Sequence, residues 1–352
     1  MRICKLLLPL LATTLAFAAQ PDRILNTIDS SQTFALPRSV HPRVQPQFDQ
    51  GAVDPSFQLT YMTLVMAPSP SQQKALDELL LRQQDPKSSN YHKWLTPAQF
   101  ADRFGLSQND LDKVTAWLQS QGFQILSTGG GRNSVIFSGS AAQVASTFDT
   151  EIHHYKVDGE MHIANSTALM IPAALNGIVK SVAGIHDFRP QPVYQGRGVG
   201  GKQKMHSDYY DALFGAEFLA PGDIGTIYDL NPLYSASPAI DGTGQKLAVV
   251  GQTDIFLSDI NFFRNGFGLT AIPTGAGGCT TDVNGLIISP CNTTNLQYVL
   301  LGTDPHGVSQ NDIGEADLDV EWTGAVARNA QIIFVNGETA DGVNDSLRAV
   351  VN

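Results

Sequence analysis

Charged side chains and cysteines are both scarce in this sequence. Aspartate, glutamate, lysine and arginine together make up 16% of its 352 residues, whereas about 25% is usual in soluble proteins. Long apolar runs are also missing, because no stretch beyond residue 17 reaches 18 uncharged apolar residues. These absences argue against a membrane-spanning segment in the main part of the chain and are typical of an exported protein.

The N-terminus has the features of a cleaved signal peptide. Arg2 and Lys5 precede an apolar run over residues 6–17, and a small-residue site follows at residues 16–18. The run is too short to serve as a permanent anchor. We therefore expect residues 1–19 to be removed and the mature protein to be secreted without a membrane attachment.

Cysteine use agrees with export. Cys4 lies in the predicted signal peptide, which leaves Cys279 and Cys291 in the mature chain. Two cysteines in an oxidising compartment can form one disulfide, and in the chain-entropy model a loop of that size contributes about 3 kcal/mol. Two free thiols are the alternative, and the sequence does not decide between them.

Basic residues are rare in the second half of the chain. Residues 217–352 carry 4 basic and 16 acidic side chains, net −12, whereas residues 1–216 carry net +1. Nucleic acid is excluded as a partner, because binding phosphate requires clusters of lysine and arginine. This acidic half is suited to low pH, because protonation of its carboxylates there removes the electrostatic repulsion among them.

The chain divides into parts that differ in composition and hydrophobic pattern. Residues 20–53 are rich in proline and polar residues and are expected to form an extended leader. Residues 54–190 interleave strand-like alternation with amphipathic segments that start at serine or threonine caps, which predicts a compact α+β domain. A proline- and glycine-rich stretch at residues 191–217 predicts a linker.

Residues 218–352 predict a different architecture. Apolar runs at residues 246–251 and 331–335 suit strands buried on both faces, and helical segments follow them. This alternation predicts a doubly wound parallel sheet of the α/β class. The glycine-rich pieces at residues 242–244 and 275–278 lack the spacing of nucleotide loops, so we interpret them as turns and expect no cofactor there.

Two carboxylates stand out in the helical segment before the second of these strands. Glu315 and Asp319 are four residues apart, so a helix places them in one stripe about 60° wide together with Trp322. Asp317 and Glu321 lie on the opposite side, toward solvent. We expect Glu315 and Asp319 to be buried side by side against Trp322 and to titrate jointly, because like charges at this spacing repel. An ordinary solvated acidic face is the alternative.

Several motifs resemble the sedolisins, a family of serine-carboxyl peptidases made with a pro-kumamolisin activation domain. The first domain is similar in the order of its motifs: Asp85-Pro86, Tyr91 to Trp94, Leu95 to Phe100, Trp117 to Phe123 and Phe137 to Ser140. The second is similar at Asp223 to Tyr234, Asp241 to Gln245 and the Glu-x-x-x-Asp helix. The resemblance covers residues 54–352. It implies a ferredoxin-like α+β activation domain, followed in residues 218–352 by the N-terminal part of a subtilisin-like α/β domain.

The resemblance also implies a chemistry. In this family a glutamate accepts the proton of a catalytic serine and an aspartate orients that glutamate, which assigns these roles to Glu315 and Asp319. A carboxylate pair can hold one proton in acid, where an imidazole base would be charged. The expected protein is a secreted, monomeric endopeptidase precursor that cleaves polypeptides in acid. Its own activation domain inhibits it until the linker is cleaved.

One departure from the family pattern is large. The family's nucleophile lies in a Gly-Thr-Ser motif, but no Gly-Thr-Ser occurs in these 352 residues. We therefore expect the chain as written to be a truncated, inactive proenzyme, with no cofactor within it and the family's Ca²⁺ site beyond residue 352. A standalone peptidase inhibitor or folding chaperone built on residues 54–190 is the alternative. A glycosidase, and a Ser-His subtilisin that uses His306, fit the pattern less well.

Four histidines suggest a trigger for release of the activation domain. His153, His154, His162 and His186 fall on or beside its predicted strands. A histidine buried in its neutral form destabilises a fold when it becomes charged, and the facing carboxylates lose charge over the same range. We expect opening between about pH 6 and 4. Scattered surface histidines are the alternative.

Overall fold

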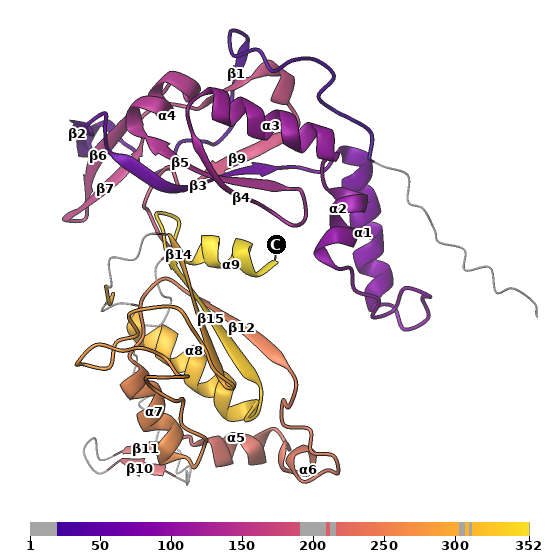
Figure 1. The fold of residues 1–352 in the computed structure, drawn as a ribbon, viewed down its shortest axis with the longest axis vertical. Coiled ribbons are helices and arrows are strands. Elements are labelled where there is room, and N and C mark those ends of the chain that lie inside the picture. The colour runs from indigo at the N-terminus through magenta and orange to yellow at the C-terminus, as the bar shows by residue number, and fades with distance from the viewer. Residues whose placement is uncertain (1–19, 191–208, 212–215, 303–306, 310–311, 352) are drawn as a thin grey trace, which may run out of the picture.

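The computed structural model describes residues 20–190, 209–211, 216–302, 307–309 and 312–351 (Figure 1). The predicted signal peptide and most of the predicted linker lie outside these residues. Within the described part of the chain, no helix is long and apolar enough to cross a membrane. The chain contains helices and several sheets, so the mixed α and β character expected from the sequence is confirmed.

The first domain is built on a four-stranded antiparallel sheet. Its strands lie in the order β4 (Gln124–Thr128), β5 (Ser134–Ser140), β3 (Gln58–Met66) and β9 (Val179–Ala183). Helices α3 (Gln108–Ser120) and α4 (Ala141–Phe148) cover one face of this sheet (Figure 1). The core lies between them, where the sheet residues Met62, Leu64 and Phe137 meet the helix residues Val114, Leu118 and Phe148. Apolar burial therefore holds this domain together.

The helices of the first domain begin where the sequence predicts. α1 (Pro70–Gln84), α2 (Pro97–Phe104) and α4 each start with a capping box, in which a Ser or Thr and a Gln three residues later satisfy each other's backbone N–H groups. Ser107 caps α3 by accepting a hydrogen bond from the backbone N–H of Asp110. These caps explain why local sequence signals locate the helices so closely.

The leader packs against the first domain. Its strand β1 (Thr33–Ala35) pairs with β8 (Met170–Pro172), and β2 (Asp49–Ala52) joins β6 (Ile152–Val157) and β7 (Glu160–Asn165) in a small sheet. Two short 3₁₀ turns, η1 (Pro46–Phe48) and η2 (Ala173–Leu175), complete these segments. Ile24 and Leu36 of the leader are buried in the same core as the main sheet. The leader therefore contributes to the fold of the domain.

The second half contains a sheet with three parallel strands. They are β12 (Lys246–Gly251), β15 (Gln331–Glu338) and β14 (Leu296–Gly302), with β13 (Cys291–Asn292) antiparallel at the edge. Sequence analysis predicted β12 and β15 but missed β14. The remaining elements are β10 (Tyr209–Asp211), β11 (Ala216–Phe218), α5 (Pro221–Ile227), α6 (Asn231–Tyr234), α7 (Leu257–Gly266), α8 (Ile313–Val326) and α9 (Val343–Val351).

The two halves meet at α9, which lies under the main sheet of the first domain (Figure 1). Asp345 and Arg348 of α9 line a small cavity together with Tyr61 and Ile136 of the first domain. Burial, and then the nearby charge of Asp345, raise the pKa of Tyr61 to about 12. Close by, Gln252 Nε2 donates to the carbonyl oxygen of Pro190 at 2.9 Å. The contact between the halves therefore includes polar and charged groups.

Candidate active site

The acidic pair lies at the start of α8. Glu315 is in the first turn and its side chain is exposed, and Asp319, one turn later, is half-buried. α8 packs on β12 and β15 and is itself covered by α7. In a parallel sheet, helices begin near the carboxyl ends of the preceding strands, where ligands usually bind. The pair is therefore in a suitable place for a reactive site.

The prediction of which face of α8 is buried is wrong. Glu315 faces solvent rather than the interior, and Asp317 and Glu321, expected to be solvated, are half-buried. Trp322 does not enclose a buried acidic pair. Its ring lies 5.9 Å from that of Phe263 in α7. Because Glu315 is exposed, there is no longer a reason to expect it to share a proton with Asp319.

Small residues explain the different orientation of α8. Ala316, Val320 and Gly324 form its buried stripe against the sheet. A Cβ atom at Gly324 would lie 2.9 Å from Nη1 of the buried Arg264, so α7 approaches α8 closely at this glycine. The periodicity argument gave most weight to the large Trp322 and overlooked these small side chains, which allow the closest packing.

Burial changes the acidity of three carboxyl groups on α8. It raises the pKa of Asp317 to about 7, with a further contribution from the charge of Asp259. It raises the pKa of Glu321 to about 7 as well, and Asp317 and Asp259 add to the effect. The pKa of Asp319 is also raised by burial. Protons on Asp317 and Glu321 are therefore favoured in mild acid.

A buried polar cluster joins Asp254, in the loop after β12, to Tyr298 of β14 and Asn336 of β15. The Asp254 Oδ1 atom accepts hydrogen bonds from Tyr298 Oη at 2.5 Å and from Asn336 Nδ2 at 2.9 Å. All three side chains are at most 1% exposed. Sequence analysis did not single them out. The polar residues that follow the predicted strand β12 were a usable signal for Asp254, whereas Tyr298 lies on the missed strand β14.

The segment before α8 is held by the loop that follows β12. Ser309 N donates to Thr253 Oγ1 at 2.8 Å, and Gln252 Nε2 donates to Asp312 Oδ1 at 3.1 Å. Asp312 also accepts a hydrogen bond from Ser309 Oγ at 2.6 Å. These bonds fix the start of α8 and therefore the turn that carries Glu315. His306, which a Ser-His site would need, lies outside the described residues.

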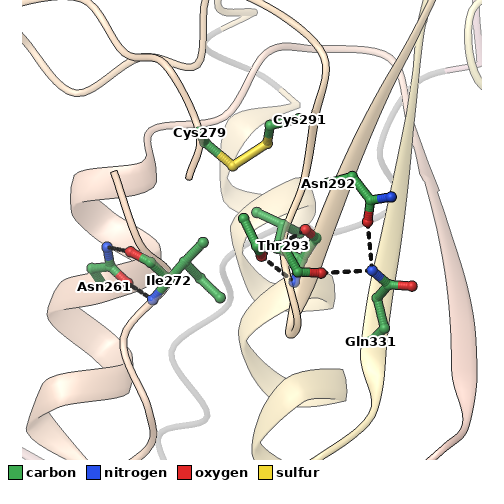
Figure 2. The surroundings of a disulfide bond; sticks show 8 residues. Asn261, Ile272, Cys279, Cys291, Asn292, Thr293 and Gln331 are labelled. Atoms are coloured by element: carbon green, nitrogen blue, oxygen red, sulfur yellow. Dashed lines mark hydrogen bonds between the residues drawn. A yellow bond between two sulfur atoms is a disulfide. The ribbon is translucent and has the colours of Figure 1, made fainter. Parts of the chain in front are cut away.

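Cys279 and Cys291 form a disulfide, with their Cα atoms 5.1 Å apart (Figure 2). Nearby polar contacts order the same region. Asn261 exchanges two hydrogen bonds with the backbone of Ile272, and Gln331 donates to the side chain of Asn292. The bridge therefore closes a loop beside β13, on the approach to β14.

Metal-binding side chains do not gather in the described residues. No group of three or more histidine, cysteine, aspartate or glutamate side chains there could hold a metal ion. The part of the chain that the structure describes therefore holds no such cluster for the Ca²⁺ implied by the family resemblance.

The first domain matches a known family over almost its whole length. Residues 48–188 match the family described as "Pro-kumamolisin, activation domain". Over these residues the chain is therefore similar to a pro-kumamolisin activation domain. The match contains the whole four-stranded sheet and both of the helices that cover it. Its first residues lie in the leader, which agrees with the packing of β2 on β6.

Three curated relatives support the same conclusion. Xanthomonalisin of Xanthomonas sp. (strain T-22) is 28% identical over 209 residues, 56% of this chain and 24% of the relative. Sedolisin of Pseudomonas sp. (strain 101) is 25% identical over 270 residues, 76% of this chain and 43% of the relative. Tripeptidyl-peptidase sed1 of Aspergillus fumigatus is 34% identical over 91 residues, 25% of this chain and 14% of the relative. The resemblance to sedolisin-family proenzymes is confirmed, and the chain spans less than half the length of each relative.

Proposed function

We propose that this chain is part of a secreted, acid-acting serine-carboxyl endopeptidase precursor, in which Glu315 is the general base and Asp319 orients it. The observation that carries the proposal is the pairing of an exposed Glu315 with a half-buried Asp319 one helical turn later. A general base must be reachable by the group that it deprotonates. The exposed position of Glu315 meets that requirement better than the buried position expected from the sequence.

The raised pKa of Asp319 supports its part in the proposal. Because burial raises this pKa, Asp319 keeps its proton to a higher pH than a fully solvated aspartate would, and a protonated carboxyl group can donate a hydrogen bond to a neighbouring carboxylate. Such a division of roles between two carboxyl groups is a known way to run acid–base chemistry in acid. Asp317 and Glu321 are the competing pair on the same helix, and their pKa values near 7 suit a less acidic range.

The topology supports the fold part of the proposal. The strand order β4-β5-β3-β9 is the order of a ferredoxin-like sheet, which we propose for the activation domain. The parallel strands β12, β15 and β14 with their helices suit a subtilisin-like domain. The 352 residues contain no Gly-Thr-Ser, so the proposal for this chain concerns the acid–base half of the triad and the inhibitory domain.

Matched substitutions on α8 test the proposal. The protein purified from its natural source should cleave an internally quenched peptide between about pH 3 and 6. Glu315→Gln in that protein should lower kcat by about 100- to 10,000-fold, the usual contribution of a general base. Glu321→Gln is the control, because it removes a carboxylate from the same helix and should leave kcat nearly unchanged. Full activity of Glu315→Gln, with a folded protein by circular dichroism, would rule out its role as base.

A standalone inhibitor remains the second candidate because the first domain has its own complete core. On this hypothesis residues 20–190 bind and inhibit a separate sedolisin-family peptidase. Titrating the purified domain into an active relative distinguishes the two functions. Inhibition without any proteolytic activity of the natural protein would favour the standalone inhibitor over the proenzyme.

A further inference from the structure

A groove runs along the free edge of the main sheet in the first domain. Among the described residues, β9 pairs with β3 on one side and with no strand on the other. A cavity of about 650 Å³ borders that free side. Residues 179–183 of β9 form one wall, and residues 34 and 36–42 of the leader form the opposite wall. The groove is therefore a slot between an edge strand and a second chain segment.

The slot has the form of a strand-addition site. The unpaired backbone groups of an edge strand are a template for another extended chain. The five residues of β9 span about 17 Å at about 3.4 Å per residue, and the groove follows all of them. Leu36, Val182 and Ile185 are buried side chains that line it. An added strand would therefore find apolar contacts as well as backbone partners.

The charged residues that line the groove are mostly basic. Arg38 stands on the leader wall and Lys180 on β9, and both are exposed. Neither makes an ion pair or a side-chain hydrogen bond within the described parts of the chain. His41 and His186 also line the groove. Its one carboxylate, Asp341, is already paired with Arg348.

A lysine on an edge strand is also a common protection against unwanted pairing. Protection alone does not account for two features of this site. A second unpaired cation, Arg38, stands on the opposite wall, and the slot between the walls stays open rather than being filled by the leader. The two cations therefore frame the slot and match carboxylates on a chain that lies in it.

We propose that this groove binds an extended acidic segment of another polypeptide, which adds to β9 as a fifth strand of the sheet. Backbone hydrogen bonds to β9 would provide the affinity, and Arg38 and Lys180 would select carboxylate side chains. The groove borders the contact between the two halves, because Asp341 of the second half also lines it, and the proposal does not depend on peptidase activity.

Fluorescence anisotropy with short labelled peptides tests the proposal on the whole chain. The probe is a hexapeptide of alternating valine and glutamate, and its comparison peptides replace glutamate by lysine or carry N-methyl groups on alternate backbone nitrogens. We expect the acidic probe to bind at least about tenfold more tightly than either comparison peptide. The double variant Arg38→Glu, Lys180→Glu should weaken binding of the acidic probe by a similar factor.

A second double variant separates specific from general electrostatic binding. Lys74→Glu, Lys87→Glu makes the same change of net charge at exposed positions outside the groove and should leave binding unchanged. Equal losses in both double variants, or equal binding of the N-methylated peptide, would overturn the proposal. Sedimentation of the free protein completes the test. A dimer that the groove variant dissociates would show that a second copy of the chain, and not another polypeptide, fills the slot.

Discussion

The two halves of the molecule bury different kinds of side chain. The first domain buries mainly apolar groups, and its one buried carboxylate, Asp110, accepts backbone hydrogen bonds from Arg23 and Ile24. In the second half, the partly buried Asp317 has an Oδ1 atom with no hydrogen-bond partner among the described residues. Unpaired buried carboxyl groups favour their neutral form. The stability of the second half should therefore depend on pH far more than that of the first.

The largest change in the free energy of unfolding should come from a cavity in the apolar core of the first domain. Phe148 is fully buried, with its ring 6.1 Å from Trp117 and 5.9 Å from Phe123. Phe148→Ala should lower the free energy of unfolding by about 3–5 kcal/mol, because it leaves a cavity. Urea unfolding followed by circular dichroism measures the loss at pH 5 and at pH 8. Phe57→Ala, at an exposed position, is the control and should have little effect.

If the stability of the first domain depends little on pH, Phe148→Ala should lower the free energy of unfolding by the same amount at both pH values. An apolar side chain neither gains nor loses a proton, so its contribution has no reason to change between them. A loss that differed strongly between pH 5 and pH 8 would mean that the first domain also depends on titrating groups.

Removing a buried carboxyl group in the second half should have a smaller effect, and it should raise the free energy of unfolding rather than lower it. The pKa of Asp317 is about 7 in the folded protein because of burial and Asp259, above its usual value near 3.9. The stability contributed by the protonated form is therefore complete below about pH 4 and lost as the pH rises through 7. Asp317→Asn should raise the free energy of unfolding at pH 8 by about 1 kcal/mol, allowing for solvent screening, with little change at pH 4.

The control for that prediction is on the same helix. Glu315→Gln removes an exposed carboxylate and should leave the pH dependence of unfolding as it is in the wild type. Unfolding midpoints in urea from pH 4 to 8 give the comparison for both variants. Equal pH dependence in Asp317→Asn and in the wild type would contradict the burial of Asp317, and with it the proposed contrast between the halves.

The helices of the first domain could be predicted from sequence because their ends carry chemical signals. Ser69, Thr96, Ser107 and Ser140 each cap a helix through a local side-chain hydrogen bond. A local interaction of this kind depends on residues three apart and so is visible in the sequence. α7 and α8 start without such a side-chain bond, so the sequence carries no comparable signal for their first residues.

The candidate site shows the limit of the same reasoning. The four-residue spacing of Glu315 and Asp319 was enough to place both on one side of α8. Which side packs inward was decided by Ala316 and Gly324 against α7 and the sheet, which is a tertiary contact. The cluster around Asp254 joins β14, β15 and the loop after β12, which are far apart in sequence, so no local pattern could assemble it.

The histidines of the first domain do not form one uniform trigger. Burial alone would lower the pKa of His153, but hydrogen bonds and charges from Asp49 and Glu151 outweigh it and raise the pKa above its usual value. Burial lowers the pKa of His186, although Asp341 and Asp187 act against it. His186 also packs against His41, with ring centroids 4.8 Å apart, and its Nδ1 atom has no hydrogen-bond partner in the described residues.

These opposite shifts predict opposite, small effects on acid stability. The raised pKa of His153 means that this histidine stabilises the folded protein below about pH 6.5 and that this stabilisation is lost as the pH rises. The lowered pKa of His186 means that stability is lost as the pH falls through the folded-state value. Between pH 7 and 5, His186→Gln should therefore reduce the acid loss of stability and His153→Gln should increase it, each by less than about 1 kcal/mol. Thermal unfolding of both variants measures this, and changes of the same sign would exclude His186 as the acid-sensitive group.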